Sequence, residues 1–251
     1  MSEADTAREE NPPRREFKAR GSFVVRCEGC NLPALNCLCP YRVSAQSHAR
    51  VWLITHRMEH YKPTNTGRLI GDVLDDTRVF TWHRTEPDTE LLALLADPGY
   101  APFVVFPDDQ PDYDHGRVVG NDAVSQALER GRTPVYILLD GTWRQARRIF
   151  RKSPYLDALP VLPLHTERHS RYRLRKSASM GHLSTAEVAA ELLRQNGDID
   201  AADVLDDYFD AFNQSYAESR GHRKIHTPSP AMKRLLERQH QVENDSENAV
   251  L

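Results

Sequence analysis

The sequence has no long hydrophobic run and little cysteine. No stretch of about 18 apolar residues, the minimum for a membrane-spanning helix, occurs in it. Residues 1–20 are polar and charged and lack the hydrophobic region of a secretory signal. We therefore expect a cytoplasmic protein without a membrane partner. In a reducing compartment its four cysteines serve as thiolates or metal ligands rather than as disulfides.

The sequence also lacks internal repeats, a G-x-G-x-x-G fingerprint and a Walker loop, so a dinucleotide-binding Rossmann domain is not supported. Instead, short apolar stretches alternate with helix-type patterns. Strands are expected at 50–55, 78–82, 102–106 and 135–139, with short candidates at 159–162 and 172–174. Helices are expected at 66–74, 86–96, 123–130, 143–151, 184–195 and 203–219. This alternation predicts an α/β fold with a mostly parallel sheet and helices on both faces.

Composition divides the chain into four parts. Residues 1–21 are a polar leader that is expected to be disordered, and 22–42 form a cysteine module. Residues 43–219 form the α/β domain, and 220–251 form a polar C-terminal tail with weak helicity near 232–239.

All four cysteines lie within thirteen residues, as Cys27-x2-Cys30-x6-Cys37-x-Cys39. Thiolates favour tetrahedral zinc, and a site with four thiolates has no open position, so it is structural rather than catalytic. An iron–sulfur cluster uses the same ligands, and the spacing does not exclude it. Because so short a module cannot bury a core of its own, a metal is expected to hold it together.

The most informative stretch is 133–139 followed by Asp140-Gly141-Thr142-Trp143. The first segment predicts a strand buried on both faces, and the residues from Trp143 onward predict a basic helix. Asp140 therefore lies where a buried strand ends and a helix begins, which is where ligands bind in open α/β sheets. Asp, Gly and Thr are also ordinary turn and cap residues, so a purely structural role stays open.

Charge is distributed unevenly, although the net charge is only −3. Residues 141–176 carry ten Lys or Arg against two acidic residues, whereas 198–210 contain six Asp. A basic segment beside a candidate site indicates an anionic partner, and a long polyanion engages several such charges together. For the arginines of 143–151, a solvated helix face is the alternative.

Several motifs, taken in order, resemble the DTW-domain family, the tRNA-uridine aminocarboxypropyltransferases. The resemblance extends over roughly residues 26–216. Its motifs are the cysteine module, Thr55-His56, Thr64-Asn65-Thr66-Gly67, Phe106-Pro107, Leu139-Asp140-Gly141-Thr142-Trp143 with Ala146, Tyr172-x-Leu174-Arg175 and Leu183-Ser184-Thr185-Ala186-Glu187. Asp140, Thr142 and Trp143 match the Asp-x-Thr-Trp pattern of the family.

The resemblance implies a fold related to the SPOUT methyltransferases, in which a C-terminal knot holds S-adenosylmethionine. The implied reaction transfers the 3-amino-3-carboxypropyl group of this donor to N3 of a tRNA uridine and releases methylthioadenosine. By analogy, three loops bind the donor through Phe106, Pro107, Leu139, Thr142, Trp143, Leu183, Ser184 and Thr185. Asp140 is the candidate catalytic base for the N3 proton. The alternative is that Asp140 only orients the uracil or the ammonium group of the donor.

The implied macromolecular partner is tRNA. Arginine is expected at its backbone because the guanidinium matches phosphate, and a tyrosine ring can stack on an unpaired base. The expected RNA contacts are Arg144, Arg147, Arg148, Arg171, Tyr172, Arg173, Arg175 and Lys176. Two rival interpretations stay open: a SPOUT-type RNA methyltransferase and a non-catalytic zinc-knuckle RNA-binding protein. The oligomeric state is also open.

Overall fold

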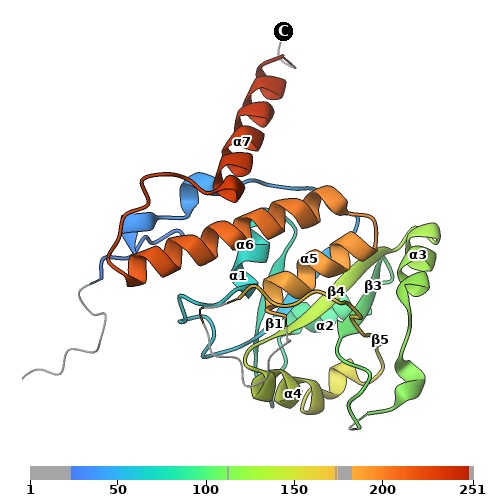
Figure 1. Ribbon diagram of the computed structural model, residues 1–251. Coiled ribbons are helices and arrows are strands. Elements are labelled where there is room, and N and C mark those ends of the chain that lie inside the picture. Colours follow the sequence, from blue (N-terminus) through green and yellow to red (C-terminus); the bar gives the residue numbers. More distant parts are fainter. Residues whose placement is uncertain (1–23, 112, 173, 175–182, 249–251) are drawn as a thin grey trace, which may run out of the picture.

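The computed structural model describes residues 24–111, 113–172, 174 and 183–248 (Figure 1). Five strands form one sheet in the order β2-β1-β4-β3-β5, and every pairing is parallel. The strands are β1 Arg50–His56, β2 Arg78–Trp82, β3 Tyr100–Val105, β4 Thr133–Asp140 and β5 Val161–Leu162. The expected parallel α/β sheet is confirmed, with β4 at its centre.

Seven helices connect and cover the strands in the described part of the chain. They are α1 Gly67–Val73, α2 Thr89–Ala96, α3 Asn121–Glu129, α4 Trp143–Arg151, α5 Thr185–Gln195, α6 Ile199–Arg220 and α7 Pro230–Asn248. Four short 3-10 turns are η1 Ala34–Asn36, η2 Cys39–Tyr41, η3 His115–Arg117 and η4 Pro154–Leu156. Within the described ranges, no helix is long and apolar enough to cross a membrane.

Side chains alternate between two cores along each strand, as the period of a β-strand requires. In β4, Tyr136 and Leu138 pack into the core under α1, α5 and α6, whereas Val135 and Ile137 pack into the core under α2 and α4. Accordingly, α4 lies on the opposite side of the sheet from α5 and α6 (Figure 1). The same alternation directs Asp140 toward α5 and its neighbour Leu139 toward α4.

The cysteine module shares the main core rather than forming one of its own. Leu32 and Leu38 are completely buried in the core that contains α6. The buried amide of Asn36 donates to Ser219 Oγ at 3.0 Å and to the Arg223 carbonyl at 2.8 Å. Its Oδ1 accepts from the Ile225 N–H at 2.8 Å. This amide therefore fastens the module to the chain that leaves the end of α6.

The polar C-terminal tail contains a helix that packs onto the domain. Met232 and Leu235 on α7 are fully buried, and α7 contacts both α6 and η2. The short strand expected near 172–174 is not formed at the described positions, because Tyr172 and Leu174 lie in irregular backbone. The Tyr172 hydroxyl instead donates to the Thr64 carbonyl, in the loop before α1.

Candidate active site

Asp140 ends the central strand with both carboxylate oxygens hydrogen-bonded. Asn65 Nδ2 donates to Oδ2 at 2.6 Å, and Thr185 Oγ1 donates to Oδ1 at 2.8 Å. Asn65 comes from the loop before α1 and Thr185 from the first turn of α5. Asp140 is only 3% exposed. Both oxygens are therefore held in place by side chains from other parts of the chain.

The orientation of the Asn65 amide is settled by its second contact. Asn65 Oδ1 accepts from the backbone N–H of Arg68 at 3.0 Å, and a backbone N–H can only donate. The Nδ2 group must therefore face Asp140. A Cβ on Gly67 would lie 2.8 Å from Asp140 Cγ, so the close approach of α1 to this carboxylate requires glycine.

Thr55 lies beside Asp140 in the register of β1 and β4. It is only 2% exposed, and its Oγ1 has no hydrogen-bond partner among the described residues. An unpaired buried hydroxyl is costly, and a ligand bound at this edge would relieve the cost. Sequence reasoning gave no role to Thr55, Asn65 or Gly67, although all three belong to the motifs that carried the resemblance.

The residues expected to bind the donor fall into two groups on opposite faces of the sheet. Thr185 lies with Asp140 under α5, and Ser184 precedes it as the helix cap. Phe106 and Trp143 lie on the α4 face, where their rings stack with centroids 5.5 Å apart. Leu139 packs into the core of that face, and Pro107 follows Phe106. Thr142 caps α4 through a capping box with Gln145, so its structural role is shown.

Glu187 fixes the chain on both sides of the segment before α5. Its buried carboxylate accepts from Ser170 Oγ at 2.7 Å, from the Arg171 N–H at 2.6 Å and from the Ser184 N–H at 2.8 Å. The expected capping contact of Glu187 with Ser184 is therefore present. Its other two contacts join residues 170–171 to the same helix start that presents Thr185 to Asp140.

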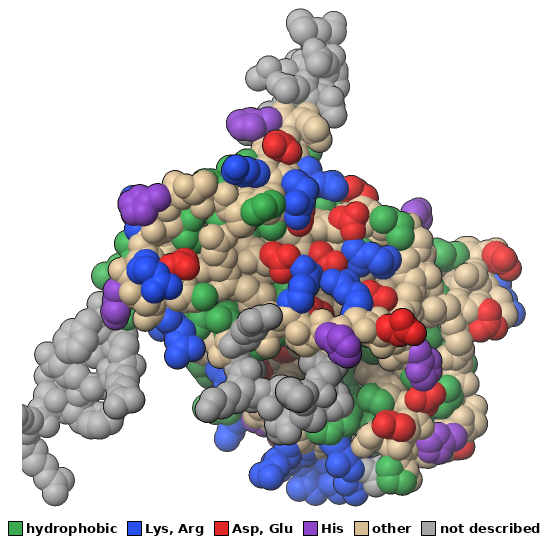
Figure 2. Space-filling view, in the orientation of Figure 1, with side chains coloured by type: hydrophobic (Ala, Val, Ile, Leu, Met, Phe, Trp, Pro, Cys, Tyr) green, Lys and Arg blue, Asp and Glu red, His purple; other side chains and the backbone are tan. Residues whose placement is uncertain are grey.

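Basic side chains gather at the lower edge of the molecule, over α4 (Figure 2). Arg144 and Arg148 are exposed there, and Arg147 is half-buried. The Arg148 guanidinium lies over the Trp82 ring, 5.7 Å from its centroid. This position leaves α4 with a cationic outer surface that a polyanion can contact.

The second basic segment meets the aspartates of α6. Arg171 pairs with Asp206 at 2.9 Å and with Asp210 at 2.5 Å, and Arg168 pairs with Glu191 and Asp206. Burial raises the pKa of Asp210, and the Arg171 charge opposes that rise. The two oppositely charged stretches of the sequence thus partly neutralise each other. Arg173, Arg175 and Lys176 lie outside the described residues.

The four cysteine sulfurs form a compact cluster in which all lie within 4.8 Å of one another. Cys27 and Cys39 Sγ are 3.7 Å apart, and Cys30 and Cys37 Sγ are 3.8 Å apart. Tetrahedral zinc with Zn–S bonds of about 2.3 Å separates its sulfurs by about 3.8 Å. All four thiols are free of disulfides. The cluster therefore fits a tetrahedral thiolate site.

The acidity of these thiols differs across the cluster. The Cys30 N–H, followed by the Cys37 thiol and the Gly29 N–H, lowers the pKa of Cys27 to about 6. Burial raises the pKa of Cys39 to about 12. A bound cation would stabilise all four thiolates together, which is the usual way in which such sites become deprotonated.

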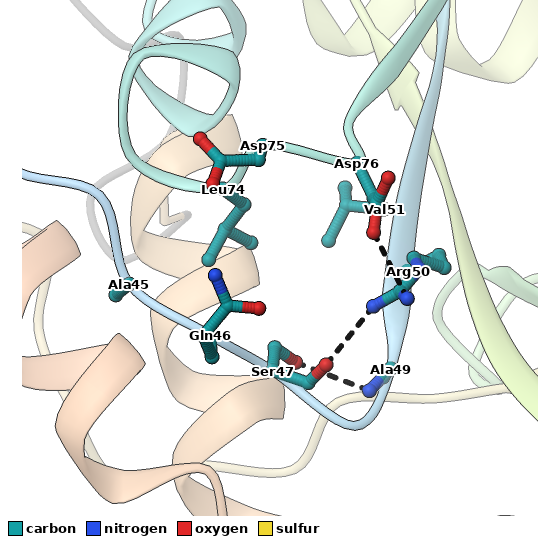
Figure 3. Close-up of a pocket in the computed structure, with 9 residues that line it drawn as sticks. All are labelled: Ala45, Gln46, Ser47, Ala49, Arg50, Val51, Leu74, Asp75 and Asp76. Carbon is teal, nitrogen blue, oxygen red and sulfur yellow. Dashed lines mark hydrogen bonds and ion pairs between the residues drawn. The ribbon is translucent and has the colours of Figure 1, made fainter.

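A narrow hollow lies at the opposite edge of the sheet, where β1 begins (Figure 3). Arg50 crosses it, bonding the Ser47 carbonyl at 3.0 Å and pairing with Asp76 at 2.9 Å. Because the strands are parallel, this hollow lies at their amino ends and Asp140 at their carboxyl ends. The hollow is therefore separate from the candidate active site.

Comparison with known proteins adds a family and a set of relatives. The model of the DTW domain matches residues 24–217. Proteins named tRNA-uridine aminocarboxypropyltransferase 2 from Mus musculus and Macaca fascicularis are each 29% identical over 177 residues, covering 66% of this chain and 55% of theirs. The protein of the same name from Drosophila melanogaster is 26% identical over 195 residues, covering 73% and 68%. The chain thus spans about half the length of the two mammalian relatives. No solved structure matches significantly.

Proposed function

Because the chain belongs to the DTW domain family, we propose that it is a tRNA-uridine aminocarboxypropyltransferase with S-adenosylmethionine as donor. The observation that carries the proposal is the buried carboxylate of Asp140, held at the carboxyl end of β4 by side chains from the loop before α1 and from the first turn of α5. The carboxyl ends of the strands are where parallel α/β sheets bind ligands. The names of the three relatives support the same reaction.

In the proposed reaction, N3 of uracil attacks the carbon that joins the aminocarboxypropyl group to the sulfonium. The C–S bond breaks as the N–C bond forms, and methylthioadenosine leaves. N3 must lose its proton, and the Asp140 carboxylate is the proposed base that accepts it. If Asp140 only orients the uracil, the carboxylate accepts a hydrogen bond from N3 and the proton passes to water. In both cases the uridine must leave the base stack to reach the edge of the sheet.

Residues on the two faces of the sheet have different proposed roles in binding the donor and the uracil. Thr55, Ser184 and Thr185 supply hydroxyls for the polar groups of the donor on the Asp140 face, and Leu183 comes directly before Ser184. Phe106, Pro107, Leu139 and Trp143 supply an apolar wall for adenine or uracil on the α4 face. Which carbon of the sulfonium faces N3 in line decides between aminocarboxypropyl and methyl transfer.

The tRNA backbone would run over the arginines of α4, which are exposed beside this edge. Arg171 and Tyr172 belong to the same proposal, although both have partners within the protein. The cysteine cluster would hold a structural zinc ion near the end of α6. A site closed by four thiolates supports the fold rather than the chemistry.

The experiment uses two labelled donors with unmodified tRNA. S-adenosylmethionine labelled in the aminocarboxypropyl group should transfer its label to tRNA, and methyl-labelled donor should yield labelled methylthioadenosine. Transfer of the methyl label to tRNA, with S-adenosylhomocysteine as product, would instead establish a methyltransferase. Binding of tRNA without transfer of either label would establish a non-catalytic RNA-binding protein.

A further inference from the structure

His56 stands at the carboxyl end of β1, on the α4 face of the sheet, and its Nδ1 is held by two donors. Gln145 Nε2 lies 3.0 Å from Nδ1, and the Met58 backbone N–H points to the same atom at 3.3 Å. A backbone N–H can only donate, so Nδ1 is the acceptor. The neutral ring therefore carries its proton on Nε2.

The amide of Gln145 is oriented by the same logic. Its Oε1 accepts from the Thr142 N–H at 2.8 Å and from Thr142 Oγ1 at 2.9 Å. With Oε1 committed to a backbone donor, Nε2 of Gln145 must face His56. The Gly141 backbone makes this contact close, because a Cβ there would lie 2.9 Å from Gln145 Cβ and 3.6 Å from His56 Cβ.

The ring itself is fixed in position by packing. The His56 ring stacks on the Trp82 ring, with centroids 6.1 Å apart and an interplanar angle of 29°. Trp82 Nε1 in turn donates to Ser153 Oγ at 2.9 Å. Arg148 lies over the Trp82 ring as well. The His56 side chain is half-buried. Its Nε2 atom makes no hydrogen bond to a described residue, and it is not among the buried atoms that lack a partner, so it is accessible to solvent. The Nε2–H group therefore reaches solvent beside the arginines of α4.

Burial and the nearby cations favour a neutral His56 ring. Burial lowers the pKa of His56 from its ordinary value of 6.5; Glu59 raises it, and the nearby cations lower it. Those cations are Arg148 on α4 and Arg57 and Lys62 in the loop after β1. Because the Nε2–H group is a neutral donor in cationic surroundings, an anionic oxygen suits it as the acceptor.

We propose that Gln145 is a positioning residue that holds His56 as the Nε2–H tautomer, and that His56 donates this N–H to a phosphate oxygen of the bound RNA. The second half of this proposal rests on the proposed function, whereas the first half concerns the free protein. Gln145 thus joins the cap of α4 to an RNA contact at the end of β1.

The first half is tested by long-range 1H–15N NMR of the full chain without RNA, with the His56 signals identified by their loss in His56→Gln. We expect Nε2 to be protonated and Nδ1 to be unprotonated in the wild type. In Gln145→Glu the carboxylate accepts from Nδ1 and stabilises the imidazolium, so the pKa of His56 should rise. Gln126→Glu adds the same charge at an exposed position on α3 and should leave His56 unchanged. A protonated Nδ1 in the neutral wild-type ring, or a Gln145→Glu spectrum like that of the wild type, would overturn the assignment.

The second half is tested by tRNA affinity at about 50 and 200 mM salt. His56→Leu should weaken binding about tenfold, the lower end of the range for a hydrogen bond to a charged group, and by the same factor at both salt concentrations. His56→Gln keeps an N–H near the position of Nε2 and should retain most of the affinity. Unchanged binding by His56→Leu, or a loss that disappears at high salt, would overturn the phosphate contact. If the wild type binds no tRNA, the proposed function and this contact both fail, while the NMR result for Gln145 stands.

Discussion

Replacing Gly67 with alanine perturbs the candidate active site at one defined contact. The new Cβ would lie 2.8, 2.9 and 3.0 Å from Cγ, Oδ1 and Oδ2 of Asp140, where ordinary contacts are 3.4–4 Å. The carboxylate must therefore withdraw by about 0.5 Å, or α1 must move by as much. Asn65 and Thr185 hold the carboxylate at 2.6 and 2.8 Å, so a shift of this size lengthens at least one of these bonds.

Two opposing effects determine how Gly67→Ala changes the free energy of unfolding, and a third determines how it changes kcat. Alanine favours a helix over glycine by about 1 kcal/mol, and forcing extra volume into a packed site costs about 1–3 kcal/mol. We expect a net loss of up to about 2 kcal/mol in the free energy of unfolding. Misplacing a reacting group by about 1 Å costs about a hundredfold in rate, so kcat should fall about 10- to 100-fold.

Gly71→Ala is the matched control on the same helix. Its Cβ would meet only Thr77, at 3.8 Å, which is an ordinary contact. This variant should keep the wild-type kcat and gain up to about 1 kcal/mol in stability. The assay is single-turnover transfer to tRNA at saturating donor, paired with urea unfolding of each variant. Wild-type kcat in Gly67→Ala, or an equal loss in Gly71→Ala, would refute the claim that the Asp140 carboxylate must occupy this position.

Four further predictions concern catalysis, the metal and RNA. Asp140→Ala should abolish transfer while leaving donor binding in calorimetry nearly intact, and turnover like that of the wild type would remove Asp140 from the reaction. Elemental analysis should find one zinc per chain, and removing it with a chelator should lower Tm by about 5–10 °C, because Leu32 and Leu38 lose their support; an unchanged Tm would contradict a structural metal. Arg148→Ala should weaken tRNA binding and reduce its salt dependence by about one unit of slope. Arg171→Ala should mainly lower the stability, because its guanidinium pairs with two aspartates of α6; a large change in salt slope with unchanged stability would instead make Arg171 an RNA contact.

The local pattern of the chain was sufficient for most of the secondary structure. β1 and β4 each lie within a few residues of their expected bounds, because buried parallel strands are nearly continuous apolar runs. The edge strand β2 also has the expected bounds. The helix near 184–195 was visible from its capping residues, Ser184 and Glu187. The packing of α7 was not predicted, because its buried residues Ala231, Met232 and Leu235 belong to one short apolar cluster in an otherwise polar segment.

The local sequence pattern did not predict contacts between residues that are far apart in the chain. The basic segment containing Arg171 gave no sign that its charges would meet the aspartates of α6, since ion pairing depends on which helix lies alongside. Gln145 was likewise indistinguishable from any surface residue of a basic helix. Its role depends on β1 lying next to β4, which brings His56 within 3.0 Å.

The sequence by itself determined the alternation of strands and helices, the four clustered thiols and the location of Asp140 after a buried strand. Each of these can be predicted from residues that are close together in the sequence, because periodicity, metal-ligand spacing and strand ends are local properties. Only the tertiary structure decided which side chains surround that carboxylate and on which face of the sheet each lies. Asn65 and Thr185 are 75 and 45 residues away from Asp140 in the chain, and the pairing of β1 with β4 and the packing of α5 against β4 bring them to it. A one-residue step along a strand reverses the face, so Asp140 and Leu139 serve opposite sides of the same edge.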